Sequence, residues 1–164
     1  MNGFLSDGDL SNEYYRMALF NAKHNNLSRA AELAQNAICL NPDDGRPRRL
    51  LGLCLYEMGD MDGAEKALSA FPELYEQVAD EHKLARAEIE NIRSLMAEKK
   101  TRKAEARARK IRHKSVRVLN IRACILAASK RYKKAARIFA RALNKDNGDK
   151  TALSGIMATC VKRR

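Results

Sequence analysis

The stretch LSRAAELAQNAICLNPDD, residues 27–44, decides the fold, because its pattern of small and apolar residues returns one period later in the chain. The second copy contains LGLCLYEMGDMDGA, residues 51–64, in which Ala64 stands where Ala30 stands in the first copy. In both copies apolar residues recur every three or four positions, the spacing of one face of an α-helix. A period of roughly 34 residues predicts helical hairpins that bury their apolar faces by stacking on one another.

A further copy lies near the C-terminus, where Ala135-x-x-x-Phe139 follows an apolar segment around Ala123. Ala135 follows Ala64 at slightly more than twice the period that separates Ala30 from Ala64. One irregular copy must therefore lie between them. Apolar stripes predict its two helices, the first with Ala85, Ile89, Ile92 and Met96, the second with Ala104, Ala108 and Ile111.

The boundary between these two helices stays open, because no glycine or proline occurs between Pro72 and Gly148. Ala104 lies more than one period after Ala64, so the loop or first helix of this copy is about six residues too long for a regular repeat. Residues 73–112 could form two helices or a single long one. If the helix breaks, we expect the break at 98–101.

These copies resemble the tetratricopeptide repeat, a helix-turn-helix unit of about 34 residues. The resemblance runs from about Ser11 to the C-terminus and implies an all-α fold, an α-solenoid of stacked TPR-like helix-turn-helix hairpins with a C-terminal capping helix. It implies close helix packing, with Ala18 or Gly52 facing Ala30 or Ala64.

The same resemblance sets the expected domain organisation. Residues 1–10 are expected to form an N-terminal tail, and residues 11–164 the repeat domain. Its expected units are repeats at about 11–44 and 45–78, an irregular repeat at 79–115, a further repeat at 116–149 and a cap helix at 150–164.

The composition fits a helical protein that we expect in the cytoplasm. Of 164 residues 45% are apolar and only 5% aromatic, and 8 Gly and 3 Pro are too few for a β-sandwich or barrel. The N-terminus lacks the segments of a secretory signal, and no apolar run approaches the ~20 residues of a membrane-spanning helix. The four cysteines form no C-x-x-C pair and no zinc-ligand spacing, so we expect buried, reduced thiols.

No motif for catalysis is present. The three histidines, His24, His82 and His113, lie far apart, and neither H-E-x-x-H, G-x-S-x-G nor a phosphate-binding glycine loop occurs. The oxygen-rich segment at 41–45 lacks the ligand spacing of a calcium loop and is expected to be a turn between repeats. We therefore expect no catalytic residue, no cofactor and no metal site.

The resemblance also implies a partner-binding groove, because in this family the first helix of each hairpin lines the concave face. By register this face would receive Tyr15, Leu19, Arg46, Arg49, Leu53, Tyr56, Lys83, Arg117 and Asn120. Tyr15, Arg49 and Tyr56 are the expected anchors, since tyrosine and arginine are frequent binding hot spots. The alternative is that Tyr15 and Tyr56 only pack between neighbouring helices.

Charge divides the chain into two unlike halves. Residues 1–78 carry a net charge of −5 and residues 79–164 a net charge of +17. Residues 99–117 hold ten basic side chains and a single acid, Glu105, and we place a basic patch at Arg102, Lys103, Arg107, Lys110 and Lys114. Such a patch predicts an anionic partner, namely nucleic acid, an acidic protein or an anionic lipid surface. A solvated outer face is the alternative, although solvated helices usually interleave glutamate with lysine.

These observations favour a non-enzymatic adaptor or scaffold that binds another protein or peptide in its concave groove. The alternative function is electrostatic binding of nucleic acid or another polyanion through the basic C-terminal half. A third possibility is a homo-oligomer in which the oppositely charged halves pair head to tail.

Overall fold

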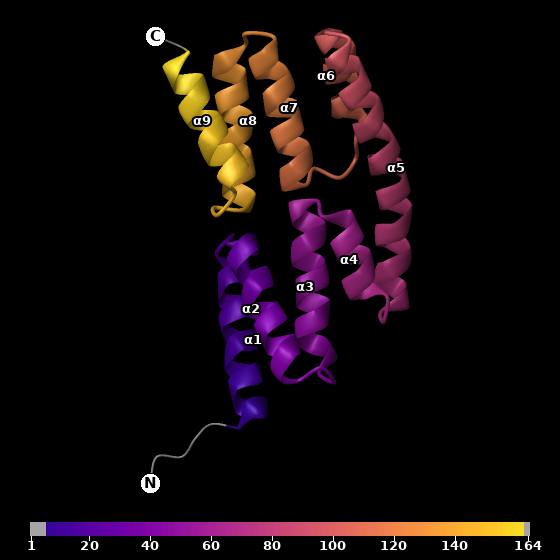
Figure 1. Cartoon of the computed structure of the whole chain (residues 1–164), viewed down its shortest axis with the longest axis vertical. Helices are drawn as coiled ribbons and strands as arrows, with labels where there is room; N and C mark the ends of the chain where they lie inside the picture. The colour runs from indigo at the N-terminus through magenta and orange to yellow at the C-terminus, as the bar shows by residue number, and fades with distance from the viewer. Residues whose placement is uncertain (1–5, 163–164) are drawn as a thin grey trace.

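The computed structural model describes residues 6–162, except for the side chains of Gln77, Glu81 and His82, and this part of the chain forms nine helices and no strand (Figure 1). Helix makes up 81% of the described residues, which confirms the all-α class. None of these described helices is both long enough and apolar enough to cross a membrane. The helices are α1 (Asp7–Lys23), α2 (Leu27–Leu40), α3 (Gly45–Met58), α4 (Met61–Leu68), α5 (Pro72–Ala97), α6 (Thr101–Lys110), α7 (Val116–Ala128), α8 (Tyr132–Lys145) and α9 (Lys150–Val161).

Helix α1 begins earlier than the repeat pattern predicts. Ser6 Oγ accepts a hydrogen bond from the backbone N–H of Asp9, and the Asp9 carboxylate accepts one from the backbone N–H of Ser6. This capping box starts the helix at Asp7. Residues 7–10 are therefore helical rather than a tail, and residues 1–5 lie outside the described residues.

Four hairpins follow one another, and α9 packs on α8 as the final helix. Each hairpin turns at a residue with a left-handed backbone, namely Asn25, Gly59, Lys99 and Lys130, with φ of 56°, 92°, 58° and 58°. The intervals between successive turn residues are the same as those between the repeated alanines at positions 30, 64, 104 and 135. The stack of hairpins with one irregular copy is therefore confirmed.

The irregular copy owes its length to α5. Helix α4 has only 8 residues, and Pro72 occupies the first turn of α5, where proline starts a helix at no cost in hydrogen bonds. Helix α5 then runs for 26 residues, a length of about 39 Å. The chain breaks at 98–100 before α6 begins, so residues 73–112 hold two helices, with the break where the sequence placed it.

The length of α5 divides the molecule into two tiers (Figure 1). Helices α1–α4 form the lower tier, α6–α9 form the upper tier, and α5 runs along both. The chain folds back so that α8 and α9 lie above α1 and α2, and the beginning of α7 meets the end of α3. The first and last hairpins thus touch, an arrangement that the repeat spacing does not predict.

Polar contacts between hairpin turns join the two tiers. Ser28 Oγ donates a hydrogen bond of 2.6 Å to Asp146 Oδ2, and the backbone N–H of Asn147 donates one of 2.8 Å to the carbonyl of Asn25. Asp146 is 2% exposed, and it also accepts from the backbone N–H groups of Ser28 and Gly148. The turn between α8 and α9 therefore caps the start of α2 across the junction.

Packing within the hairpins depends on the expected small residues. Ala18, Ala30 and Ala64 have no exposed surface. Gly52 faces Leu68 rather than Ala64, and the Cβ of any other residue at this position would overlap the Leu68 side chain. The small residues do allow close approach, but the contact of Gly52 lies one helical turn further along α4.

Two surface features differ from the expectations. The outer face of the cap helix α9 exposes Leu153, Met157 and Val161, so this cap is apolar where end caps are usually polar. The expectation of buried thiols holds only for Cys54, whereas Cys39, Cys124 and Cys160 are exposed. These three cysteines lie on helix faces that no neighbouring hairpin covers. The general preference of cysteine for buried positions does not predict which helix faces stay uncovered.

Candidate functional site

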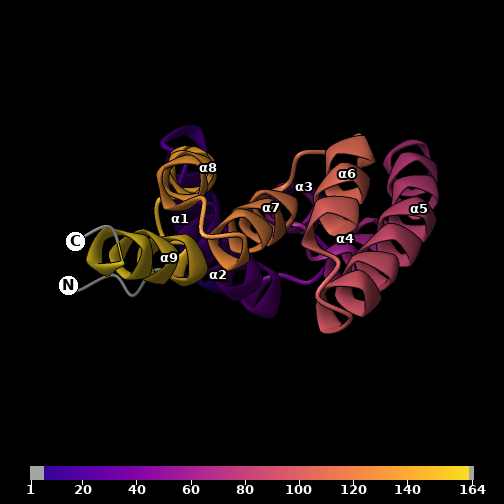
Figure 2. The ribbon, with the colours of Figure 1, turned by 90° about the horizontal axis from the view of Figure 1, so that it is seen from above.

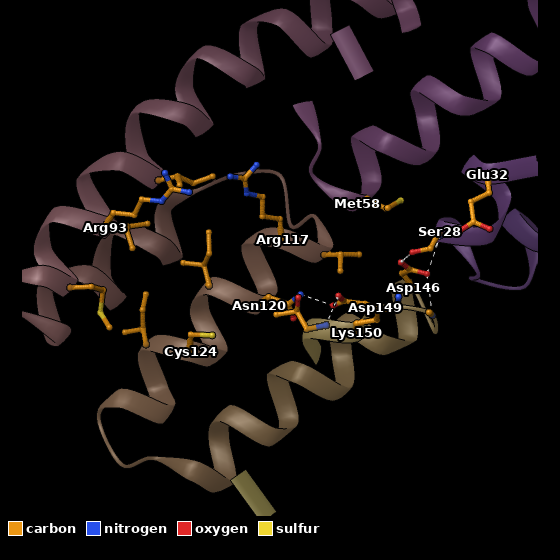
Figure 3. A pocket seen from close by; sticks show the side chains of 18 residues that line it. Ser28, Glu32, Met58, Arg93, Arg117, Asn120, Cys124, Asp146, Asp149 and Lys150 are labelled. Atoms are coloured by element: carbon orange, nitrogen blue, oxygen red, sulfur yellow. Dashed lines mark hydrogen bonds between the residues drawn. The ribbon is translucent and has the colours of Figure 1, made fainter. Parts of the chain in front are cut away.

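A cavity of about 770 Å³ opens where the two tiers meet (Figure 3). Its walls come from α5 and α7, from the turn between α8 and α9, and from the facing ends of α2 and α3. The volume lies within the range of sites that bind small molecules or peptide side chains. The cavity exists only because the upper tier folds back over the lower one.

Branched apolar side chains form the floor of the cavity. Helix α5 contributes Ile89 and Ile92, and α7 contributes Ile121 and Ile125. Ile92 and Ile125 are buried between the two helices, whereas Ile89 and Ile121 are only partly buried. The apolar stripe of α5 therefore serves both the helix packing and the cavity.

Asn120 provides the most constrained polar group of the cavity. Its side chain is 8% exposed, and its Nδ2 donates a hydrogen bond of 2.5 Å to Asp149 Oδ2. Asp149 is in turn the N-cap of α9, accepting from the backbone N–H groups of Thr151 and Ala152. With Nδ2 fixed in this way, Asn120 Oδ1 is buried and has no hydrogen-bond partner among the described residues. A buried acceptor without a partner costs free energy.

Charged groups lie at two sides of the cavity. Figure 3 shows Arg93 and Arg117 on one side, and Glu32, Asp146 and Asp149 on the other. The three acids already have partners inside the protein, since Glu32 lies 2.8 Å from Arg29 and both aspartates cap helices.

Two cations of the cavity have no such partner. Arg93 pairs with Glu90 at 3.4 Å, but within residues 6–162 no ion pair is formed by Arg117 or Lys150, which also line the cavity. Arg117 and Lys150 are therefore the cations of the cavity that can pair with an anion of a ligand.

Cys124 places a thiol in the cavity wall. Its residue is exposed, but the surrounding wall withdraws the sulfur from water and raises the pKa of the thiol. The thiol therefore stays protonated at neutral pH, and it is positioned to report on what enters the cavity.

Two of the nine residues predicted for the groove, Arg117 and Asn120, line this cavity. Cys124 follows them one turn along the same helix. The other seven predicted residues lie outside it, on α1, α3 and α5: Tyr15, Leu19, Arg46, Arg49, Leu53, Tyr56 and Lys83.

Tyr15 and Arg46 contact each other in the lower tier. The Arg46 guanidinium stands 5.3 Å from the centroid of the Tyr15 ring and also binds Asp44 at 2.7 Å and Asn12 at 3.0 Å. Its hydrogen bond to the Asp44 side chain lowers the pKa of that carboxyl. Asp44 is the N-cap of α3, so this group of residues stabilises the start of the helix.

The remaining predicted groove residues have separate surroundings. The Tyr56 ring packs against His113, with the ring centroids 4.1 Å apart, and against the cluster around Leu68. Arg49 lines a separate hollow beside Phe71. Leu53 and Lys83 are exposed, and Leu19 is half-buried.

The basic patch separates into exposed and internally bonded side chains. Arg102, Lys103 and Lys110 are exposed and form no ion pair within the described part of the chain. Arg107 lies 3.2 Å from Glu88 of α5. Lys114 donates to the carbonyls of Arg109 and Ile111 and so caps the end of α6.

The register of the hairpins did not identify the cavity residues outside α7. Ser28, Met58 and Asp146 reach the cavity from the ends of helices and turns, which line no groove in a regular stack. The one available signal was the apolar stripe of α5, which the sequence assigned to packing within the hairpin.

Comparison with known proteins identifies the family of the lower tier. Residues 22–89 match a family model described as tetratricopeptide repeat. The matched segment begins in the last turn of α1 and ends within α5, so α6–α9 lie outside it. No curated protein matches the chain. This match supports a tetratricopeptide repeat family for the segment 22–89.

Proposed function

We propose that this protein is a non-enzymatic adaptor that captures a peptide segment of another protein in the cavity between its two tiers. Tetratricopeptide repeats generally mediate contacts between proteins and are typically non-catalytic. The observation that carries the proposal is the cavity itself, whose lining combines the aliphatic side chains Ile89 and Ile121 with Arg117, a cation that forms no ion pair among the described residues.

The lining of the cavity defines the chemistry of the peptide. An aliphatic side chain of the peptide would contact Ile89 and Ile121, which are only partly buried in the cavity wall. A carboxylate next to that side chain would pair with Arg117, which has no ion pair within residues 6–162. The favoured ligand is therefore an extended segment that combines aliphatic and acidic residues.

Cys124 allows a direct test of this location. A photoactivatable cross-linker is attached to Cys124 in a variant in which Cys39 and Cys160 are replaced by serine, and the protein is irradiated in host-cell lysate. The control carries the same cross-linker on Cys160, on the outer part of α9, with Cys39 and Cys124 replaced. We expect peptides that cross-link from Cys124 and not from Cys160. Equal cross-linking from both positions would contradict a specific cavity ligand.

The peptides identified in this way are then synthesised and titrated against variants. Arg117→Ala combined with Asn120→Ala removes a charge-assisted contact and a polar side chain of the cavity wall, so affinity should fall about tenfold or more. Arg49→Ala is the matched control, because Arg49 lies on the lower tier outside the cavity. A loss of binding in Arg49→Ala with full binding in the double variant would place the ligand in the lower-tier groove instead.

A further inference from the structure

Helices α6 and α8 present a second, electrostatic surface that the cavity does not use. Figure 2 shows α7 between α8 and α6, and α7 packs against both. Four of the arginines on these three helices are Arg109 of α6, Arg122 of α7, Arg131 at the N-cap of α8 and Arg141 within α8. We call these four residues the arginine cluster.

A single carboxylate sits within the arginine cluster. Glu105 of α6 binds Arg109 at 2.5 Å and Arg131 at 2.6 Å. Arg122 and Arg141 form no ion pair within the described part of the chain. Burial, and then the positive charges of Arg141 and Arg109, lower the pKa of Arg122. The cluster therefore holds four cations against one anion.

Three of the five arginines of the lower tier, Arg16, Arg29 and Arg46, lie within 3.0 Å of a nearby acid. Outside the cluster, α6 and α8 expose six further basic residues that form no ion pair within residues 6–162, namely Arg102, Lys103, Lys110, Lys133, Lys134 and Arg137. We call the arginine cluster together with these six residues the basic face. Mutual repulsion on this face is relieved when an anion binds to it.

The types of side chain on the basic face indicate which class of anionic partner it can bind. The large apolar residues that the described structure exposes lie on α1, α3, α5 and α9, and not on α6 or α8. The face therefore lacks the apolar centre of a protein interface and the apolar anchors of an interfacial membrane helix. Phe139 is buried and Tyr132 half-buried, so aromatic side chains are not available to stack on the bases of a single strand.

We propose that the basic face is a docking surface for double-stranded nucleic acid, held through its phosphates without reading the base sequence. Guanidinium groups bind phosphate oxygens in a bidentate manner, and the face is rich in them. Helix α8 has 14 residues and spans about 21 Å. A duplex carries one charge per ~1.7 Å of its axis, so several phosphates face the helix at once.

This surface is independent of the cavity. Arg117, Asn120 and Cys124 line the cavity from α7, whereas Arg122 of the same helix belongs to the arginine cluster. The two sites therefore lie on different sides of α7, and a duplex on one does not occlude a peptide in the other.

The test measures binding of a fluorescein-labelled 20-base-pair DNA duplex by fluorescence anisotropy between 50 and 300 mM NaCl. The logarithm of the association constant should fall linearly with the logarithm of salt concentration, with a slope of about −0.9 for each phosphate contacted. A second duplex of scrambled sequence should bind equally well. Absent binding, or binding that does not change with salt, would overturn the proposal.

Two variants with equal net charge locate the contact. Lys110→Glu, Arg137→Glu and Arg141→Glu together should weaken duplex binding at least tenfold and make the slope shallower by about 3. The matched control reverses three exposed lysines elsewhere, Lys23, Lys66 and Lys162, and should keep the wild-type slope. Equal losses in both variants would show that only net charge matters and would refute a defined face.

Removing the single acid of the arginine cluster should act in the opposite direction. Glu105→Gln releases Arg109 and Arg131, so the duplex should bind several-fold more tightly. A misfolded variant would bind more weakly, so tighter binding is specific to the proposal, and unchanged or weaker binding contradicts it.

Vesicles of anionic lipid and a polyglutamate peptide serve as competitors in the same assay. Preferential binding of either one over the duplex would overturn the assignment to nucleic acid. The variant Arg117→Ala with Asn120→Ala should bind the duplex like the wild type, which separates this proposal from the peptide cavity.

Discussion

Gly59 combines two constraints at a single residue of the tier junction. Its φ of 92° lies in the left-handed region, where a side chain adds strain, and a Cβ would stand 2.6 Å from Ser115 Oγ and 2.7 Å from the Cβ of Arg117. Gly59→Ala should therefore lower the free energy of unfolding by about 1–3 kcal/mol, as measured by urea denaturation.

Gly8 provides the matched control for this substitution. It lies in the first turn of α1, and the nearest atom to its Cβ position is Ser6 Oγ at 3.8 Å. Gly8→Ala should leave stability unchanged or raise it slightly, because alanine favours the helix. An equal loss in both variants would show that neither the conformation nor the contacts of Gly59 are special.

The four thiols should react at different rates, because they differ in exposure to solvent and in the pKa of the thiol. Burial, with a contribution from the charge of Asp146, raises the pKa of Cys54 to about 11. Folded Cys54 is therefore protonated at pH 8, and we expect iodoacetamide to label Cys39 and Cys160 first, Cys124 more slowly, and Cys54 only after unfolding. Mass spectrometry of timed samples gives the order, and early labelling of Cys54 would contradict its burial.

The Cys54 thiol should also make the free energy of unfolding fall at alkaline pH. In the unfolded chain Cys54 ionises near the ordinary thiol value of about 8.5, while in the folded chain it stays neutral up to pH about 11. Ionisation thus favours the unfolded chain, and stability falls as the pH rises through this window. Cys54→Ser should reduce that fall, with urea midpoints at pH 7 and pH 10 as the measurement.

At the scale of elements, the turn between α8 and α9 should stabilise α2. Asp146→Ala and Ser28→Ala each remove the 2.6 Å hydrogen bond between these side chains, and each should cost about 1–3 kcal/mol, because the contact is partly buried and Asp146 itself is buried. The double variant should cost less than the sum of the two, with a coupling of about 1 kcal/mol or more. Additive losses would show that the two residues act separately.

The sequence predicted these elements where it carries a local signal. Small residues at fixed intervals indicated the hairpins, and the weak segment at 98–101 indicated the break before α6. The early start of α5 also had a signal, Pro72 in its first turn, but the repeat pattern outweighed it. The sequence gives no signal for the length of α5, because its charged and apolar residues continue a helical pattern through both tiers.

The cavity shows what a one-dimensional pattern cannot predict. Arg117 and Asn120 were found because α7 keeps the register of the family, whereas Ser28 and Asp146 lie 118 positions apart. Their meeting depends on the direction in which the upper tier folds, which is set by long-range contacts and not by the repeat. A groove inferred from register therefore included the lower-tier residues and omitted the junction.

At the scale of the whole molecule, the two tiers surround an open cavity and do not share one continuous hydrophobic core. The accessible surface is 10465 Å², whereas a compact protein of 18.5 kDa exposes about 8,200 Å². The excess fits an open arrangement in which the tiers touch at α5 and at the hairpin turns. The stability of these contacts then determines whether the cavity persists.

The tier contact should resist salt, because the partly buried hydrogen bonds of Asp146 and the backbone bond between Asn147 and Asn25 hold it. The ion pair of Lys145 with Glu57 is partly exposed, so its screening costs about 1 kcal/mol or less. Small-angle scattering should therefore give the same radius of gyration at 50 mM and 1 M NaCl, and a larger one for Asp146→Ala with Gly59→Ala at both. Expansion of the wild type in high salt would mean that charge attraction between the acidic and basic halves, and not these hydrogen bonds, keeps the cavity closed.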